Sequence, residues 1–568
     1  MSGRFATKDE VRRTTTACNV NECIRLLNDG KHDNGLYERI SSLCPAGGPV
    51  VWCDDDGTCR VVSDDSHSIT FASTGRGKTR RVVYPSIQTM ILAGSSLVVN
   101  DMKGEIYQQT QKLLESMGYA TYVLDLREPA KSSHRYNPLA IAWDEYAAGN
   151  EDRAFLYLRN FGLSVFSQLE SNTSDPFWTA TATDYFLGLS LGMLEKGVSK
   201  EEFTLESVAL MDRKGNAKSG MGKTILAEFF ASMGDDSLSA QYASGTIDAP
   251  NDTRMSILSV FRQPMSLYAG QRGLMDVLSH SDFTPADIAL EKRAFFLISP
   301  DETHSLGPVV VGIVNQIMSA LVSHAQSTCK GRLPRRVEFV LDEFGNLPCK
   351  VPDMAALVSA ARSRNIRLHF VLQSEHQLTH VYGNDLKEVI LDNVDTWIYM
   401  GSRGLEFMKH ISELAGEVHT PSGKTEPLLS VSQLQHLEKR CEDTEALVFT
   451  SYLRPFVAAL RDIGAYEPIT RTSKSLPPKR RVRRRTYDIG SVVEAEKERK
   501  LRELVEEAMP GLAFDDRENG NIPKHARVAP GCEDLGAGVH LPWRDDQSRR
   551  GEDGGKAQGP DTEVVTAD

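Results

Sequence analysis

The sequence SHSITFASTGRGKT at Ser66–Thr79 decides the fold class of this chain. Its first half alternates polar and apolar side chains at positions 68–71, as a β-strand does. Its second half is rich in glycine and ends in the tripeptide Gly-Lys-Thr at positions 77–79. A strand that runs into a glycine-rich turn of this kind is typical of the loop that cradles nucleotide phosphates.

The residue types of this loop suit phosphate binding. Glycines let consecutive backbone N–H groups turn inward and form an anion-binding nest. The helix that follows directs its positive N-terminal end at the same phosphates. Lys78 is expected to reach the β- and γ-phosphates, and the Thr79 hydroxyl is expected to bind Mg²⁺. We therefore predict that ATP and Mg²⁺ are the cofactors and that the following residues hold the nucleotide: Ser73, Thr74, Gly75, Arg76, Gly77, Lys78 and Thr79.

The loop departs from the full phosphate-binding motif at one position. The motif begins with a glycine, and Ala72 stands there in this chain. We interpret the stretch as a variant of the motif, because Gly75 keeps a flexible point within the loop. The alternative is a Gly-Lys-Thr sequence that occurs by chance, and the rest of the chain favours the first interpretation.

The composition is that of a protein with more than one domain. With 568 residues, 40% hydrophobic and 25% charged, the chain is too long for a single core. Its net charge of −12 argues against coating nucleic acid by bulk charge, although a local basic surface remains compatible with it. No apolar run reaches the length of a membrane span, so an intracellular protein is expected. Nine scattered cysteines without an early C-x-x-C pair indicate reduced thiols rather than a zinc site.

The pattern along the chain predicts an α/β fold with an inserted helical domain. Apolar strands at 96–100 and 121–126 alternate with helices, as in a parallel sheet covered on both faces. From 144 to 291 the pattern is helical, with a helix start at Asp175-Pro176. The aromatic residues that recur after this start suit either base stacking or a core, and a core is the more frequent case. The sheet pattern returns at 293–299.

Two adjacent carboxylates follow the next buried strand. That strand, at 337–341, ends in Asp342 and Glu343. Ligands of open parallel sheets bind at the carboxyl ends of the strands. Asp342 is therefore predicted to hold Mg²⁺, and Glu343 is predicted to activate the water that attacks the γ-phosphate. The alternative is a strand that merely ends in solvated acids, which the upstream phosphate loop disfavours.

Two arginines and a glutamine flank the following strand, at 366–372. Arg362 and Arg364 precede it, and Gln373 with Ser374 caps its far end. An arginine near the nucleotide edge of such a sheet can act on a nucleotide bound by a neighbouring subunit. A surface arginine paired with an acid is an equally good interpretation at this point.

These motifs together resemble the type IV secretion coupling proteins of the TraG/TraD conjugation class. That class lies within the additional-strand RecA-like ATPases, which include HerA and FtsK. The resemblance covers about residues 35–465. The stretches that carry it are Ala72–Thr79, VVND at 98–101 with KGE at 103–105, YNPL at 136–139, DPFW at 175–178, LDEFGNLP at 341–348, ARSR at 361–364, QS at 373–374, QL at 377–378 and YG at 382–383.

The resemblance implies a fold, a set of roles and partners. It implies a RecA-like P-loop ATPase domain with an all-α insert, assembled as a homo-hexamer. Lys78, Thr79, Asp342 and Glu343 take the roles given above, Gln373 senses the γ-phosphate, and Arg362 or Arg364 is the trans-acting arginine. The implied partners are DNA with its relaxase and the components of a type IV secretion channel.

Coupling proteins of this class usually begin with transmembrane helices, and this chain starts at about the point where those helices would end. A separate membrane-anchor protein is therefore expected to recruit it from the cytoplasm to the cytoplasmic face of the membrane. The expected division of the chain is an N-terminal extension at 1–48, a RecA-like domain at 49–143 and 292–466, the all-α insert at 144–291, and a basic, largely disordered tail at 467–568. The basic run Lys479–Arg485 suits DNA phosphates, an anionic membrane or a solvated linker.

Three functions follow from the sequence. The first is an ATP-driven coupling protein that powers conjugative DNA transfer. The second is a soluble DNA translocase of the HerA/FtsK kind that works in DNA processing or defence. The third is a non-catalytic adaptor that exports protein cargo.

Overall fold

The computed structural model describes ten ranges of the chain: residues 3–29, 35–54, 56–166, 176–219, 222–234, 236–300, 304–419, 424–440, 442–470 and 483–508. Two compact units divide the chain at residue 494. The first unit, residues 1–494, contains the elements described here except the second part of the last helix. The predicted disordered tail from 513 onward lies outside the described residues.

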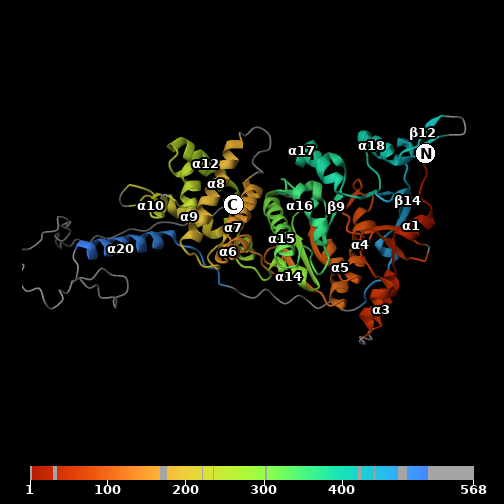
Figure 1. Ribbon diagram of the computed structural model, residues 1–568, viewed down its shortest axis with the longest axis horizontal. Helices are drawn as coiled ribbons and strands as arrows, with labels where there is room; N and C mark the ends of the chain where they lie inside the picture. Colours follow the sequence, from red (N-terminus) through yellow and green to blue (C-terminus); the bar gives the residue numbers. More distant parts are fainter. Residues whose placement is uncertain are drawn as a thin grey trace, which may run out of the picture. The chain divides into compact units, whose positions relative to one another are not determined.

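A nine-stranded sheet forms the centre of the first unit (Figure 1). Its strand order is β14-β13-β10-β4-β9-β8-β5-β7-β6, and the seven strands from β10 to β6 are parallel. The two remaining strands are antiparallel and lie at one edge. The bounds are β4 Ser68–Phe71, β5 Ser96–Asp101, β6 Ala120–Asp125, β7 Arg293–Ile298, β8 Val337–Leu341, β9 Ile366–Leu372, β10 Thr396–Tyr399, β13 Asp443–Thr450 and β14 Leu453–Arg461.

The strand order places three predicted motifs side by side. Strand β9 lies between β4, which leads into the phosphate loop, and β8, which leads into the two carboxylates. This is the additional strand that the sequence resemblance implies. Since these strands are parallel, the residues that follow them meet at one edge of the sheet.

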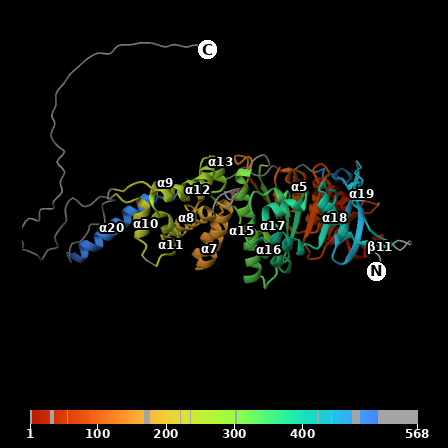
Figure 2. The ribbon, with the colours of Figure 1, turned by 90° about the horizontal axis from the view of Figure 1, so that it is seen from above.

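Helices cover both faces of the sheet, as the near-continuous apolar strands predict. In β7, Phe295 and Leu297 join one core, while Phe296 and Ile298 join the other. The first core contains α15 Gly307–Ser327, α16 Met354–Ala361, α17 Glu375–Asp392 and α18 Leu405–Ala415. The second contains α4 Tyr84–Leu92 and α5 Glu105–Ser116, and Figure 2 shows α5 and α15 to α17 on opposite sides.

A small sheet of order β1-β3-β2 lies near the N-terminus. Strands β2 Val50–Cys53 and β3 Cys59–Val61 form a hairpin, and β3 also pairs with β1 Thr16–Cys18 rather than with the main sheet. The helices around it are α1 Lys8–Thr14, α2 Val20–Asn28 and α3 Leu36–Leu43. The expectation of reduced thiols is wrong for Cys18 and Cys44, because the fold brings them together in a disulfide.

An all-helical segment separates β6 from β7, as predicted. Its helices are α6 Ala140–Ala147, α7 Glu151–Phe166, α8 Pro176–Glu195, α9 Leu205–Gly215, α10 Ile225–Ala231, α11 Leu238–Ile247, α12 Asn251–Ala269, α13 Arg272–Val277 and α14 Pro285–Leu290. Helix α8 begins at Pro176, and the predicted cap Asp175 lies outside the described residues. Tyr185 and Met193 of this helix are buried, so these residues belong to the core rather than to a surface for base stacking.

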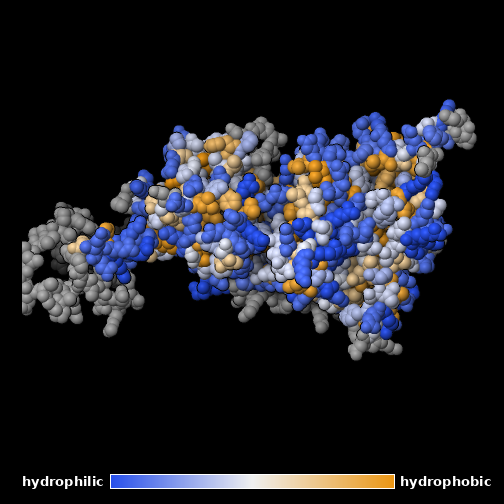
Figure 3. Space-filling view, in the orientation of Figure 1, coloured by the Kyte–Doolittle hydropathy of each residue, from blue (hydrophilic) through white to orange (hydrophobic). Residues whose placement is uncertain are grey.

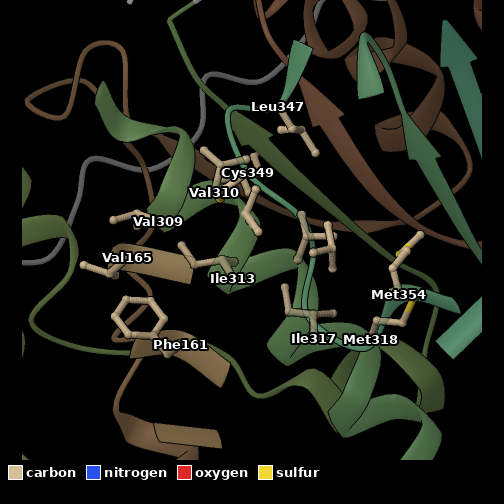
Figure 4. Packing of buried hydrophobic residues seen from close by; sticks show 14 of the residues in the cluster. Phe161, Val165, Val309, Val310, Ile313, Ile317, Met318, Leu347, Cys349 and Met354 are labelled. Carbon is tan, nitrogen blue, oxygen red and sulfur yellow. The ribbon is translucent and has the colours of Figure 1, made fainter. Parts of the chain in front are cut away.

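The helical insert is joined to the sheet domain by packing of α7 against α15. Figure 4 shows Phe161 and Val165 of α7 beside Val309 and Ile313 of α15. The insert also exposes large apolar side chains, and Figure 3 shows apolar patches on this part of the surface. These exposed side chains include Leu156, Phe177, Leu238 and Met255.

The remaining elements complete the described chain. The helix after the phosphate loop is continuous: a π-helix, η1 Thr79–Val83, leads directly into α4, and Pro85 lies in the first turn of α4. The last helix, α20 Ile489–Ala508, begins three residues before the predicted position. The others are η3 His304–Leu306, η4 Phe344–Asn346, η5 Arg362–Arg364, β11 Glu417–His419, β12 Thr425–Pro427, α19 Val431–Gln435 and η6 Ile463–Ala465.

Within the described residues, α15 is long and apolar enough to cross a membrane by length and composition. Its apolar window is 72% buried inside the protein. Gln316 of this helix donates a hydrogen bond to the carbonyl of Pro138, and Asn315 donates one to the carbonyl of Pro352. The amide nitrogens of both residues therefore have partners within the core, whereas Gln316 Oε1 has no hydrogen-bond partner among the described residues.

Candidate nucleotide-binding site

The phosphate loop begins between the ends of two neighbouring strands. The Ala72 N–H donates to the carbonyl of Leu372 at the end of β9, at 3.0 Å. The Ser73 N–H donates to the carbonyl of Gly401 just after β10, at 2.9 Å. These two bonds fix the start of the loop to the rest of the sheet edge.

The backbone conformation explains why alanine is tolerated at the first position of the motif. The left-handed residues of the loop are Gly75, with φ 82°, and Gly77, with φ 84°, and Ala72 is not among them. A Cβ at Gly77 would also lie 2.1 Å from Nη1 of Arg81. Glycine is therefore required at the two later positions but not at Ala72.

Lys78 and Glu343 form an ion pair across the sheet edge. Lys78 Nζ lies 2.5 Å from Glu343 Oε1, at the distance of an ion pair but without the angles of a hydrogen bond. Lys78 is buried, and the Glu343 side chain is about one-fifth exposed. The predicted phosphate ligand and the predicted base are therefore held together by attraction between opposite charges in a partly dry site.

Gln373 links the phosphate loop to the same carboxylate. Its Nε2 donates to Glu343 Oε2 at 3.4 Å, and its Oε1 accepts from the Thr74 hydroxyl at 3.3 Å. Because Gln373 ends the strand between β4 and β8, its side chain lies between the loop and the carboxylates. Gln373 therefore contacts both the phosphate loop and Glu343, and its role as a γ-phosphate sensor stays a prediction.

Glu343 is held in an unusual conformation by its neighbours. Its φ of 52° is left-handed, which costs free energy in a residue with a Cβ. Asn346 donates to Glu343 Oε2 at 3.1 Å, and Gln377 donates to Asn346 at 2.8 Å. Both amides belong to stretches that carry the family resemblance, yet sequence reasoning assigned them no role.

Asp342 has the properties of a metal ligand. It is buried, and its Oδ1 has no hydrogen-bond partner among the described residues. Burial, with the nearby negative charge of Glu343, raises the pKa of Asp342 to about 7, although the positive charge of Lys78 opposes the shift. A divalent cation would satisfy this oxygen and favour the ionised form, so the residues present fit Mg²⁺.

The described residues contain no group of three or more His, Cys, Asp or Glu side chains that could bind a metal. Asp101, at the end of β5, is a neighbouring carboxylate whose pKa is raised by burial. It accepts N–H bonds from Gly104 and Tyr107 at the start of α5, so it acts as a helix cap.

Arg362 and Arg364 lie at the other edge of the sheet. They precede β9, whereas Gln373 follows it, so seven strand residues separate them from the phosphate loop. The two arginines are therefore not near the nucleotide edge, because a parallel strand carries the residues that precede it and those that follow it to opposite edges of the sheet. Arg362 pairs with Asp395 at 3.1 Å and is half exposed, and Arg364 donates to Ala360 and Gln326.

Sequence reasoning missed a segment that covers the phosphate loop from the side. The carbonyl of Leu437 accepts from Arg76 at 2.9 Å, and Lys439 donates to the carbonyl of Gly75 at 2.5 Å. No motif marks this segment, which lies more than 350 residues downstream of the loop. A cavity of about 470 Å³ lies between them, lined by Ser73, Thr74, Gly75, Arg76, Ser402, Arg403, Met408, Gln435 and Lys439.

Two larger cavities lie away from this edge. One of about 640 Å³ lies beside α6, α7 and α15, and one of about 740 Å³ lies between α9 and α12. Neither is lined by residues of the phosphate loop or by the two carboxylates. The cavity of about 470 Å³ beside the phosphate loop is therefore the better candidate for a nucleotide site.

The family model for type IV secretory system conjugative DNA transfer matches residues 8–426. The chain belongs to this family. Among members of the family, it is 25% identical over 535 residues to the protein VirD4 of Rhizobium radiobacter, covering 90% of this chain and 72% of that protein. It is 26% identical over 385 residues to the conjugal transfer protein TraG of Escherichia coli, covering 64% of this chain and 58% of that one.

Solved structures of a coupling protein share the fold of this family member. The plasmid coupling protein TrwB in complex with an ATP analogue matches with a TM-score of 0.55 and 14% identity, covering 85% of this chain and 98% of that one. TrwB in complex with ADP and Mg²⁺ matches with a TM-score of 0.52 and 14% identity, covering 81% and 94%. The predicted RecA-like fold with a helical insert is therefore confirmed.

Proposed function

We propose that this protein is an ATP-driven coupling protein that brings a DNA–relaxase substrate to a type IV secretion channel and powers conjugative DNA transfer. The observation that carries the proposal is the set of contacts that joins Thr74, Gln373, Glu343 and Lys78 across three adjacent strands. Membership of the conjugative DNA transfer family supports DNA export as the process that ATP hydrolysis drives.

The contacts suggest how the site responds to ATP. In the structure, Lys78 neutralises Glu343. The phosphates of a nucleotide carry more negative charge than one carboxylate, so Lys78 turns from Glu343 to the β- and γ-phosphates. Glu343 is then free to accept the proton of the water that attacks the γ-phosphate, while Gln373 reports the presence of that phosphate to the loop.

The Thr79 hydroxyl and the Asp342 carboxylate are the proposed ligands of Mg²⁺. The unpartnered Oδ1 of Asp342 supports this assignment. When bound, the ion supplies positive charge that offsets the charge of the phosphates. The cavity beside the phosphate loop is the proposed place for the ribose and the base, because its volume is within the usual range for ligand sites.

The proposed assembly is a homo-hexamer in which an arginine acts between subunits. Arg362 and Arg364 are too far from the phosphate loop of their own chain to touch its nucleotide, because about 20 Å of strand lies between them. If either arginine takes part in catalysis, it therefore acts on a nucleotide that a neighbouring copy of the chain binds. Arg362 is the better candidate, because its side chain is 55% exposed.

The proposed partners are DNA with its relaxase, components of the secretion channel, and a separate membrane protein that recruits the chain to the cytoplasmic face of the membrane. Helix α15 takes no part in this recruitment, because its apolar window is 72% buried inside the protein. Fractionation of cells tests it. The protein should stay in the cytosolic fraction when it is expressed alone and should move to the membrane fraction when the rest of the secretion locus is present. If it stays cytosolic in both conditions, recruitment is overturned.

The experiment that tests the proposed function is an ATPase assay with and without single- and double-stranded DNA. A DNA motor is supported if DNA stimulates the hydrolysis of ATP and if the substitution Glu343→Gln abolishes it. Dependence of DNA transfer between cells on the same residue then separates the coupling protein from a soluble translocase. A folded protein that binds ATP without hydrolysing it in any condition would overturn the motor and favour a cargo adaptor.

A further inference from the structure

Two cysteines of the N-terminal hairpin face each other across neighbouring strands. Cys53 ends β2, Cys59 begins β3, and the register of this antiparallel pair places them directly opposite. Directly opposite residues have side chains on the same face of a sheet and Cα atoms about 4.5 to 5.5 Å apart. This separation is within the range that a disulfide bond spans, so the two sulfurs can bond without movement of the strands.

A third side chain, far away in the sequence, closes over both sulfurs. The hydroxyl of Tyr466 lies 3.3 Å from Cys59 Sγ and 3.5 Å from Cys53 Sγ. Tyr466 follows the strand β14 and the turn η6, and it is buried. The three polar atoms therefore form one cluster that neither the nucleotide site nor the proposed mechanism uses.

The two thiols are not equivalent. Hydrogen bonding from Cys59, assisted by Tyr466 and by the Arg461 N–H and charge, outweighs burial and lowers the pKa of Cys53 to about 6. The same pairing, together with burial, raises the pKa of Cys59. Cys53 is partly exposed, whereas Cys59 is fully buried. An accessible thiolate thus lies beside a buried thiol, which is the arrangement of an attacking and a resolving cysteine.

We propose that Cys53 and Cys59 are a redox-active thiol pair that a low-molecular-weight disulfide oxidises to a cross-strand disulfide. The geometry that carries the proposal is the direct register of the two cysteines, the partial exposure of Cys53 and the Tyr466 hydroxyl over both sulfurs. The pair is separate from the disulfide already present between Cys18 and Cys44.

The reaction balances as two successive exchanges. The Cys53 thiolate attacks one sulfur of the small disulfide, forms a mixed disulfide and releases one small thiolate. Cys59 then loses its proton to solvent and attacks Cys53 Sγ, which forms the Cys53–Cys59 bond and releases the second small thiolate. Starting from the Cys53 thiolate, the protein gives up two electrons and the Cys59 proton, and the small disulfide gains the two electrons and leaves as two thiolates that take protons from solvent.

The test uses the full-length protein and oxidised glutathione as the probe. After exposure, the remaining thiols are alkylated, and the unreduced digest is analysed by mass spectrometry. The expected product is one cross-linked peptide that joins Cys53 to Cys59, with Cys23 and Cys349 still alkylated. Before oxidation, iodoacetamide at pH 7 should label Cys53 roughly tenfold faster than Cys329, another partly exposed free cysteine.

Single variants separate the two roles. Cys59→Ser should retain glutathione on Cys53, because the resolving thiol is missing, and Cys329→Ser should behave as the parent protein. Tyr466→Phe keeps the ring, removes the hydroxyl and should slow the labelling of Cys53. The proposal is overturned if both thiols of the parent remain alkylatable after oxidation. It is also overturned if Cys59 is found joined to Cys18, its neighbour on β1, or if Cys59→Ser accepts no glutathione.

Discussion

At the scale of single residues, the Lys78–Glu343 ion pair joins the predicted phosphate ligand to the predicted base. Each charge neutralises the other in a place that is largely shielded from water. Removing either side chain therefore has two effects, one on nucleotide binding and one on the partner that is left without its counter-charge. The two substitutions are expected to affect different steps of the reaction.

Glu343→Gln should keep ATP binding and lower the rate of hydrolysis by about 10² to 10⁴, because an amide cannot accept the proton of the attacking water. Binding of a fluorescent ATP analogue and release of phosphate measure the two steps separately. Lys78→Ala should lose tight binding, because the positive charge that meets the phosphates is gone. Hydrolysis by the Glu343 variant at the parent rate would show that another residue is the base.

A second buried ion pair lies beneath the site, at the amino ends of the same strands. Glu338 of β8 pairs with Arg367 of β9 and accepts from His369 at 2.9 Å, and both members of the pair are almost completely buried. Arg367 also donates to the carbonyls of Gly47 and Asp64, which precede the phosphate-loop strand. Although burial opposes it, the positive charge of Arg367 and the His369 hydrogen bond hold the pKa of Glu338 below its usual value.

Glu338→Gln should lower the thermal midpoint by the equivalent of about 3 to 5 kcal/mol at pH 7, because it leaves the Arg367 charge buried without a partner. The folded pKa of Glu338 lies below the unfolded one, so its stabilisation is present above about pH 4.5 and is lost as the pH falls toward the folded pKa. The difference between the two proteins should therefore shrink below about pH 4.5. Lys409→Ala, in an exposed ion pair, is the control and should leave the midpoint unchanged.

At the scale of secondary-structure elements, the contact of α7 with α15 sets how the helical insert meets the sheet domain. Gly312 of α15 lies against the ring of Phe161 of α7, and a Cβ there would be 2.6 Å from the ring. The close approach of the two helices therefore depends on a glycine rather than on the apolar pattern. Cys349 adds a contact to the Ser164 carbonyl at the same junction.

Gly312→Ala should lower the thermal midpoint by the equivalent of about 1 to 3 kcal/mol, because the added methyl group forces α7 and α15 apart. Gly245→Ala in α11 is a matched control, since no atom lies within 4 Å of the position of its Cβ. That substitution should raise the midpoint slightly, because alanine favours a helix over glycine by up to about 1 kcal/mol. An equal effect of the two changes would mean that the junction is not tightly packed.

At the scale of the whole molecule, the position of Arg362 means that the role proposed for it in ATP hydrolysis requires a second copy of the chain. The arginine lies at the edge of the sheet opposite its own phosphate loop. A single chain therefore has the loop, the base and the sensor but supplies no arginine from η5 to its own nucleotide. Activity that depends on Arg362 must come from contacts between copies.

ATPase activity should rise more steeply than linearly with protein concentration in the range in which the ring assembles. Arg362→Ala and Lys78→Ala should each be inactive alone, and their mixture should recover part of the activity. The recovery comes from interfaces that combine an intact loop with an intact arginine. If no mixing ratio restores activity, Arg362 has a structural role through Asp395, and the same experiment with Arg364→Ala provides the comparison.

The sequence by itself determined the elements that local chemistry specifies. Gly75, Gly77 and Lys78 form a recognisable loop because few residue types tolerate left-handed backbone and few bind phosphate. Asp342 and Glu343 follow a strand that is apolar except for Glu338, and that pattern predicts burial with ligands at its end. The insert was visible because helical periodicity replaced strand periodicity over many residues. The same local information identified the family.

The tertiary structure decided everything that depends on which strands and helices become neighbours. The position of β9 between β4 and β8 brought Gln373 beside both Thr74 and Glu343, and hydropathy contains no signal for the order of strands in a sheet. The loop near Lys439 reaches the phosphate loop, and Tyr466 reaches Cys53 and Cys59, across hundreds of residues without a shared motif. Such contacts arise because the chain buries apolar surface over its whole length at once. The position of each polar group is then a consequence of global packing rather than of its own sequence neighbours.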